Sequence, residues 1–127
     1  MLDHVSITVP DIAAVRSFYD AVMQALGYPC VYVKDDAVGY GLRARPDAPG
    51  RSYISILQSP AMQPDPRRHW CFKAASHEQV RAFYAAALQA GGRDDGPPGP
   101  RPHYHDRYYA AFVIDPAGNR IEAACHV

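Results

Sequence analysis

The first segment of the chain, Leu2–Val9, alternates between polar and apolar side chains. An alternation of period two predicts a β-strand with one face on the core and the other facing a cavity or solvent. The apolar set is Val5, Ile7 and Val9, and the polar set is His4, Ser6 and Thr8. The first strand is therefore expected to present His4 on its open face.

The pattern changes to helical spacing after Pro10. Asp11 is a favourable N-cap residue, and Gly27 stands where a C-terminal glycine cap is expected. The apolar residues between them recur at helical spacing; they are Ile12, Val15, Phe18, Tyr19, Val22 and Leu26. A helix is therefore predicted from Ile12 to Leu26. Turn residues then separate three expected strands, Cys30–Lys34, Val38–Arg43 and Ser52–Gln58, and residues 59–68 are interpreted as a linker.

The second half of the chain repeats the first. His69–Lys73 alternates like a strand, and a capping box from Ser76 to Gln79 opens a helical pattern that two glycines end. The motif Val-Arg-x-Phe-Tyr begins at Val15 and again at Val80, 65 residues later, and His4 and His69 are also 65 residues apart. Two features in one register indicate an internal duplication. We predict one domain of two modules, residues 1–58 and 69–127.

The last part of the chain combines a proline-rich stretch, an aromatic run and a hairpin. Gly96–Pro102 is interpreted as a loop that leads into His103–Tyr109. Ala110–Ile114 and Asn119–His126 are expected to pair as strands around the turn Asp115–Gly118. Each half therefore runs strand, helix, then two or three strands.

Composition narrows the possible functions. The chain has 127 residues and a formal net charge of zero, so no electrostatic field steers it toward nucleic acid or a membrane surface. Three cysteines are an odd number, which argues against a disulfide framework and favours a reducing compartment. Neither a signal peptide nor an apolar run of the roughly 20 residues that span a bilayer is recognised. We expect a cytoplasmic protein, and its small size favours a homodimer.

Three side chains that could bind a metal fall on equivalent faces of predicted strands. His4 and His69 lie on the polar faces of the first strands of the two halves, and Glu122 lies on the polar face of the last strand. If the halves pack as two-fold copies, these faces converge on one cup. Two imidazoles and a carboxylate suit a divalent iron, manganese, nickel or zinc ion and leave positions open for a ligand.

The chain resembles the vicinal oxygen chelate superfamily, which includes glyoxalase I, extradiol dioxygenases and bleomycin-resistance proteins. The resemblance rests on His4-Val5, on Val15–Tyr19, on His69 and above all on Asp115–Glu122. It implies an α+β fold of two βαβββ modules that form a cup-shaped mixed sheet with the helices outside. It also implies that His4, His69 and Glu122 match three metal-ligand positions, and that the cup is built within one chain or between two.

Two departures from the family patterns bear on activity. The four-ligand glyoxalase I pattern has a carboxylate where this chain has Ser55. The extradiol dioxygenase pattern has a histidine near the position of His105 and a tyrosine where Phe112 stands, and phenylalanine cannot donate a proton.

The remaining candidate residues surround the predicted cup. The candidates for proton transfer are His105, Tyr104 and Tyr109, and the candidates for substrate binding are His103, Tyr108, Phe112 and Arg43. Arg43 can bind a carboxylate or phosphate with two hydrogen bonds, although a surface charge at a strand end is the alternative interpretation. Cys71, Cys30, Cys125, His77 and His126 are interpreted as fillers or bystanders.

The leading hypothesis is a metal-dependent, glyoxalase-like enzyme of lyase or isomerase type acting on a small molecule with adjacent oxygens. One alternative is an extradiol-type dioxygenase. Another is a metal-free protein that binds a small molecule, as antibiotic-resistance members of the superfamily do.

Overall fold

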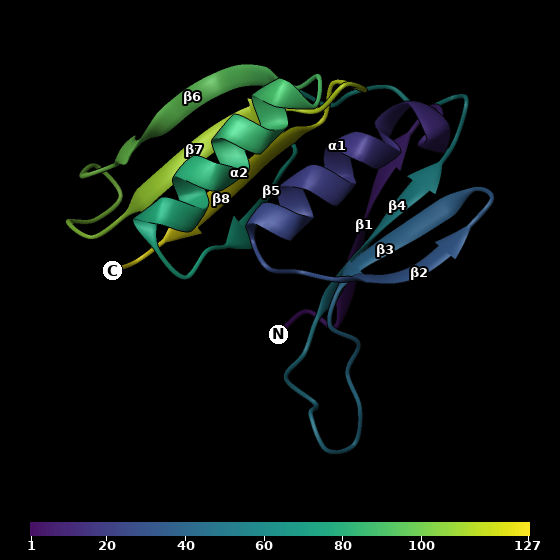
Figure 1. Cartoon of the computed structure of the whole chain (residues 1–127), viewed down its shortest axis with the longest axis horizontal. Coiled ribbons are helices and arrows are strands. Elements are labelled where there is room, and N and C mark those ends of the chain that lie inside the picture. Colours follow the sequence, from purple (N-terminus) through teal and green to yellow (C-terminus); the bar gives the residue numbers. More distant parts are fainter.

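The computed structural model describes all 127 residues and contains two helices and eight strands (Figure 1). The first half comprises β1 (His4–Val9), α1 (Ile12–Ala25), β2 (Cys30–Lys34), β3 (Ala37–Gly41) and β4 (Tyr53–Gln58). The second half comprises β5 (His69–Lys73), α2 (His77–Gln89), β6 (Arg93–Pro100), β7 (Tyr109–Ile114) and β8 (Arg120–Cys125). The predicted order of strand, helix and three strands is present in both halves.

Each half forms its own curled four-stranded sheet. The strand orders are β1-β4-β3-β2 in the first sheet and β5-β8-β7-β6 in the second. The first and last strands of each half are parallel neighbours, and the other pairs are antiparallel. The two registers match, because Ser6 lies opposite Ser55 while Cys71, 65 residues after Ser6, lies opposite Glu122. Ser55 and Glu122 therefore occupy equivalent positions.

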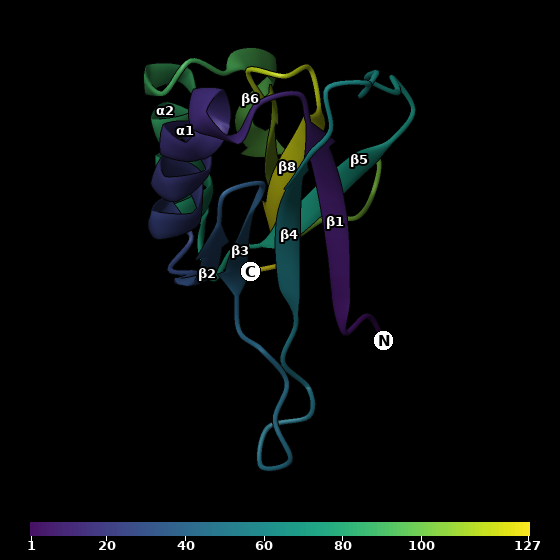
Figure 2. The ribbon, with the colours of Figure 1, turned by 90° about the vertical axis from the view of Figure 1, so that its right-hand side faces the viewer.

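The two helices lie side by side against the same side of the two sheets (Figures 1 and 2). A single core of 21 buried residues contains apolar side chains from both halves, among them Phe18, Val22 and Phe83. The alternation read from the sequence is present in β1, where Ile7 and Val9 are buried and His4 is exposed. The core therefore fills the helix side of each sheet and leaves the other side open. Neither helix is long and apolar enough to cross a membrane.

The helix ends have the predicted caps. The Asp11 carboxylate accepts a hydrogen bond from the Ala13 amide at 2.9 Å, and Gly27 has a positive φ of 77°. At α2 the Ser76 hydroxyl accepts from the Gln79 amide at 3.2 Å, while the Gln79 side chain accepts from the Ala75 amide at 2.7 Å. These bonds satisfy amide groups that lack partners inside a helix.

The prediction of a loop at Gly96–Pro102 was wrong for its first five residues, which belong to β6. β6 lies at the edge of its sheet, so a proline that cannot donate a hydrogen bond can be accommodated there. Two register shifts interrupt the pairing, which runs through Gly96 and Gly99 rather than through the prolines between them. The composition is that of a loop, but the edge position allows an irregular strand.

Candidate functional site

A buried carboxylate lies at the centre of the open face of the second sheet. The Glu122 side chain is only 3% exposed, and its Oε2 atom lies 3.3 Å from His69 Nε2. The Tyr108 hydroxyl donates a hydrogen bond of 2.6 Å to the other oxygen, Oε1. No lysine or arginine pairs with this carboxylate. A buried negative charge without a fixed positive partner is costly, so the site favours a cation.

The groups around Glu122 keep their protons. Burial, reinforced by the Glu122 charge, raises the pKa of the Cys71 thiol to about 12. Burial and the hydrogen bond to Glu122 raise the pKa of the Tyr108 hydroxyl well above its ordinary value. Tyr108 is therefore a hydrogen-bond donor at neutral pH, and its donation fixes the orientation of the carboxylate.

A pair of histidines lies beyond Tyr108. His105 Nε2 is 2.9 Å from His126 Nδ1, and the two rings are stacked. The Arg107 amide donates to His105 Nδ1 at 3.1 Å, so in the neutral ring Nε2 carries the proton and donates it to His126. Both rings contact the Tyr108 ring edge-on, with centroids 5.4 and 5.1 Å away. The pair is linked to Glu122 through Tyr108.

The motif Asp115-Pro-Ala-Gly-Asn119 positions the last strand. The buried Asp115 carboxylate accepts hydrogen bonds from the amides of Ala117 and Asn119, each within 3.0 Å, and from the Tyr19 hydroxyl. The Asn119 side chain donates to the carbonyl of Thr8 at 3.0 Å. These bonds tie the turn before β8 to α1 and to the end of β1. The motif is structural and sets the place of Glu122 without touching it.

The open face of the first sheet has a different chemistry. Ser55, equivalent to Glu122, accepts a hydrogen bond of 2.6 Å from the Tyr32 hydroxyl. The Tyr32 ring lies over Gly39, because a Cβ atom at that glycine would be 2.2 Å from Tyr32 Cε1. The Arg43 guanidinium lies 5.1 Å from the Tyr32 ring centroid and 5.5 Å from that of Tyr53. This face carries hydrogen-bond donors where the second sheet carries a carboxylate.

His4 is not brought to Glu122 within one chain. Its ring stacks on Tyr53 with centroids 5.2 Å apart, and its Nδ1 atom lies 2.7 Å from the Asp3 carboxylate. A groove of about 650 Å³ between the two halves is lined by His4 and Tyr53 from one and by Cys71 from the other. No group of three or more His, Cys, Asp or Glu side chains could hold a metal ion within one chain. The structure therefore joins two of the three predicted ligands.

The other predicted site residues fall at different places. Phe112 lies directly opposite Glu122 in the strand pair, under the Arg101 guanidinium, whose Cζ is 5.6 Å from the ring centroid. Tyr104 is 58% exposed and contacts the rings of His103 and Tyr108. The two residues lie at the rim of the second sheet, beside Tyr108.

Tyr109 lies away from Glu122. Its ring stacks on His77 of α2 with centroids 3.9 Å apart, and its hydroxyl accepts from Arg81 at 3.4 Å. Residues 109, 111 and 113 alternate with the open-face positions, and Ala111 and Val113 belong to the core. Parity along β7 therefore gives Tyr109 a helix-facing position, which does not favour a role in proton transfer at Glu122.

Sequence reasoning missed several partners in these clusters. His126 was interpreted as a bystander but bonds His105, and Cys71 was interpreted as a filler but contacts the charge of Glu122. Parity did place both on the open face of the second sheet. Tyr32 was not singled out at all, and the signal that could have found it is Gly39, which leaves room for a large ring on the neighbouring strand.

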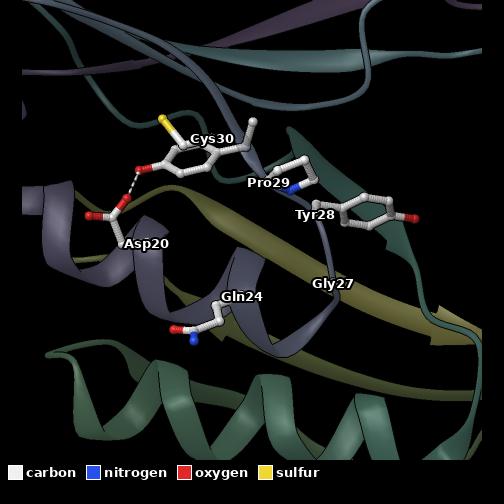
Figure 3. Close-up of a pocket in the computed structure, with 7 residues that line it drawn as sticks. Asp20, Gln24, Gly27, Tyr28, Pro29 and Cys30 are labelled. Atoms are coloured by element: carbon white, nitrogen blue, oxygen red, sulfur yellow. Dashed lines mark hydrogen bonds between the residues drawn. The ribbon is translucent and has the colours of Figure 1, made fainter.

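A second cavity lies on the helix side of the first sheet, at the end of α1 (Figure 3). Its volume is about 530 Å³, and its lining includes Asp20, Gln24 and Cys30. Asp20 accepts hydrogen bonds from Arg16 at 3.1 Å and from the Tyr40 hydroxyl at 2.6 Å, so its charge is already satisfied. No uncompensated charged group marks this cavity as a site.

Comparisons with known proteins agree with this geometry. Among solved structures, a glyoxalase/bleomycin resistance protein from Albidiferax ferrireducens T118 is 32% identical to this chain with a TM-score of 0.77, and the match covers 98% of this chain and 97% of that one. A genomically encoded fosfomycin resistance protein from Listeria monocytogenes is 17% identical with a TM-score of 0.67, over 98% and 91% of the two chains. Lactoylglutathione lyase from Agrobacterium tumefaciens is 18% identical with a TM-score of 0.63, over 98% and 92%.

The last two likenesses show the fold alone. None of the curated proteins compared with the chain matches it. The model of one family, described as the Glyoxalase/Bleomycin resistance protein/Dioxygenase superfamily, matches residues 1–123. The two βαβββ modules and this match confirm the resemblance read from the sequence. The chain belongs to the Glyoxalase/Bleomycin resistance protein/Dioxygenase superfamily.

Proposed function

We propose that this protein is a metal-dependent, glyoxalase-like enzyme of lyase or isomerase type that acts on a small molecule with adjacent oxygen atoms. The observation that carries the proposal is the buried Glu122 carboxylate, which faces His69 Nε2 at 3.3 Å and has no lysine or arginine partner. An imidazole and a carboxylate are ligands that iron, manganese, nickel and zinc all accept. The residues present therefore fit a divalent ion.

We propose that the third ligand is His4 of the partner subunit in a homodimer. β1 and β5 are the outer strands of their sheets, so each leaves one edge unpaired within the chain. An unpaired edge can be completed by a strand from another molecule. Placing β1 of one subunit beside β5 of the other brings His4 of the partner subunit toward His69 and Glu122, and two-fold symmetry makes two such sites.

A bound divalent ion supplies Lewis-acid chemistry, because it holds two adjacent substrate oxygens and stabilises negative charge that develops on them. Tyr108 holds the Glu122 carboxylate in place through its 2.6 Å hydrogen bond. His105 is the proposed proton carrier, because its Nδ1 atom has a lone pair that can exchange the Arg107 amide for a substrate proton. Phe112 excludes water beside Glu122 and cannot donate a proton, which favours lyase or isomerase chemistry over dioxygenation.

A metal-free binding protein is the second candidate. The observation that favours it is the open face of the first sheet, where Tyr32, Tyr53 and Arg43 form an aromatic and cationic surface without a carboxylate. A small molecule could bind there without chemistry. The two candidates differ in whether Glu122 holds a metal.

The proposal is tested by metal content after reconstitution of chelator-treated protein with each of the four ions. The wild type is expected to take up one ion per chain, and Glu122→Gln is expected to lose at least about 100-fold in metal affinity because it removes the anionic ligand. The control is Glu78→Gln, which makes the same chemical change in the first turn of α2 and should bind like the wild type. A wild type that takes up no metal contradicts the enzyme proposal and favours the binding protein.

Mixed dimers test the shared site. His4→Ala and Glu122→Gln subunits, carrying different tags and coexpressed, form a dimer in which one site has lost both ligands and the other is intact. That dimer is expected to hold about half the metal of the wild type, although each variant alone holds little. If each site lies within one chain, the mixed dimer holds no more than either parent.

A further inference from the structure

The open face of the first sheet carries a cluster of side chains that the proposed metal site does not use. Four contacts join its members in one chain, from His4 to Tyr53, Tyr53 to Arg43, Arg43 to Tyr32, and Tyr32 to Ser55. The Lys34 ammonium also lies 5.7 Å from the Tyr32 ring centroid. This cluster is called the Arg43 cluster below.

The two tyrosine rings hold the Arg43 guanidinium in place. Its Cζ atom is within 5.5 Å of both ring centroids, a distance at which a cation is attracted to an aromatic ring. Such stacking occupies the flat faces of the group and leaves the N–H donors at its rim free. A guanidinium fixed in this way is prepared to donate two parallel hydrogen bonds to an oxyanion.

The cluster contains donors and no negative charge. Neither Arg43 nor Lys34 forms a salt bridge with a carboxylate. The neighbouring Arg45, in contrast, lies 3.7 Å from Asp47. The Ser55 hydroxyl accepts the Tyr32 proton in its only side-chain hydrogen bond, so its own proton remains available for donation.

We infer that the Arg43 cluster binds the acid group of the substrate, so that the substrates of this protein are small organic acids carrying a carboxylate, phosphate or phosphonate. The inference deepens the proposed function and rests on it for the link to catalysis. Ser55 is central to it. A carboxylate at that position would offer a negative charge to the incoming acid group, whereas the serine offers a proton.

The place of the cluster limits the size of the substrate. A single ring, that of Tyr53, separates the His4 imidazole from the Arg43 guanidinium, with 5.2 Å on one side and 5.5 Å on the other. A molecule whose oxygens lie at a metal held by His4 can therefore reach Arg43 with an acid group only a few bonds away. The inference favours compact acids over large conjugates whose acid group is remote from the reacting oxygens.

The test is a titration of chelator-treated, full-length protein with inorganic phosphate, and separately with acetate, at constant ionic strength. Binding is followed through the side-chain Nε–H signal of Arg43 in nitrogen-15 spectra. Arg43→Ala is expected to weaken phosphate binding at least about tenfold, because it removes a pair of charge-assisted hydrogen bonds. Arg43→Lys keeps the charge without the planar fork and should weaken it less. Arg45→Ala, which removes an arginine paired with Asp47, should bind like the wild type.

The outcomes separate this inference from the metal proposal. A tighter response to phosphate than to acetate assigns the cluster to phosphate or phosphonate, and the reverse assigns it to carboxylates. Equal binding by wild type and Arg43→Ala overturns the inference, as does equal weakening by Arg43→Ala and Arg45→Ala, which marks only diffuse charge attraction. Glu122→Gln should lose metal and keep phosphate binding, and Arg43→Ala should do the reverse. A protein that binds phosphate at Arg43 but takes up no metal sinks the enzyme proposal alone.

Discussion

The open faces of the two sheets differ at one equivalent position, and the difference decides what each can bind. Glu122 in the second sheet and Ser55 in the first occupy the same register beside the first strand of their module. Each accepts a hydrogen bond of 2.6 Å from a tyrosine hydroxyl, that of Tyr108 or that of Tyr32. The two halves therefore keep the same arrangement around side chains of opposite electrostatic effect.

The surroundings follow the central side chain in each half. Beside Glu122, a neutral thiol and an imidazole leave the carboxylate free to bind a cation. Beside Ser55, the cations Arg43 and Lys34 lack carboxylate partners and are free to attract an anion. A duplicated scaffold can thus provide a site for a metal in one half and a site for an acid group in the other. Bringing the halves together would place both sites in one cup.

Cys71 provides the largest expected difference between the two faces. Because its pKa is raised to about 12, very little of the thiol is ionised at pH 8, and only the thiolate is alkylated. After allowance for the greater nucleophilicity of a more basic thiolate, we expect iodoacetamide to react roughly 50-fold more slowly than with an ordinary thiol. The rate should rise with pH toward 12. Peptide mass spectrometry of metal-free protein measures Cys71 beside the exposed Cys30 of the first sheet.

Glu122→Gln sharpens that measurement. The substitution removes the negative charge that helps to hold the thiol neutral, so it should lower the pKa of Cys71 and speed its alkylation while Cys30 is unchanged. If Cys71 and Cys30 react equally fast in the wild type, the second face does not carry the negative field that separates it from the first.

The sequence predicts the shared geometry of the two faces better than their differences. Alternation along β1 and β5, together with the repeat, predicts which side of each strand is open, and the paired registers confirm the equivalence of Ser55 and Glu122. These features depend on local periodicity, which a single sequence displays directly. The same periodicity applied to β7 would have placed Tyr109 on the helix side.

The remaining features depend on contacts between distant segments. The stacking of Arg43 on Tyr32 and Tyr53 requires the end of β3, the edge of β2 and the start of β4 to meet, and no local pattern records that meeting. The proline-rich strand β6 is allowed by its edge position, which is a property of the sheet and not of the segment. The separation of His4 from Glu122 likewise follows from how the two modules pack within the chain.

Ser55→Glu would make the first face resemble the second. The new carboxylate would accept the Tyr32 proton as Glu122 accepts that of Tyr108, and it would place a negative charge near Arg43. We expect phosphate affinity to fall about tenfold, which corresponds to about 1.4 kcal/mol. The titration described for Arg43 measures it, and Ser59→Glu, which adds the same charge at the other end of β4, is the control. Unchanged phosphate binding in Ser55→Glu would show that the identity of this residue does not separate the faces.

Gly39→Ala tests the smallest element of the comparison, the place of the Tyr32 ring. A Cβ atom at this position would lie 2.2 Å from Tyr32 Cε1, so the ring must move away. The ring is the far end of a side chain on an edge strand and can swing outward, so the free energy of unfolding should change by no more than about 1 kcal/mol. Arg43 would then lose one of two aromatic supports, and phosphate affinity should fall about threefold.

Gly50→Ala is the matched control, because a Cβ atom there meets no other group within 4 Å. Its phosphate affinity should equal that of the wild type, and chemical denaturation of both variants checks that stability is not the cause of any difference. If Gly39→Ala keeps full phosphate affinity after its Tyr32 ring has moved, Arg43 does not need the tyrosine to bind an anion. The first face would then differ from the second only by its charges, and not by a guanidinium that the aromatic rings hold ready.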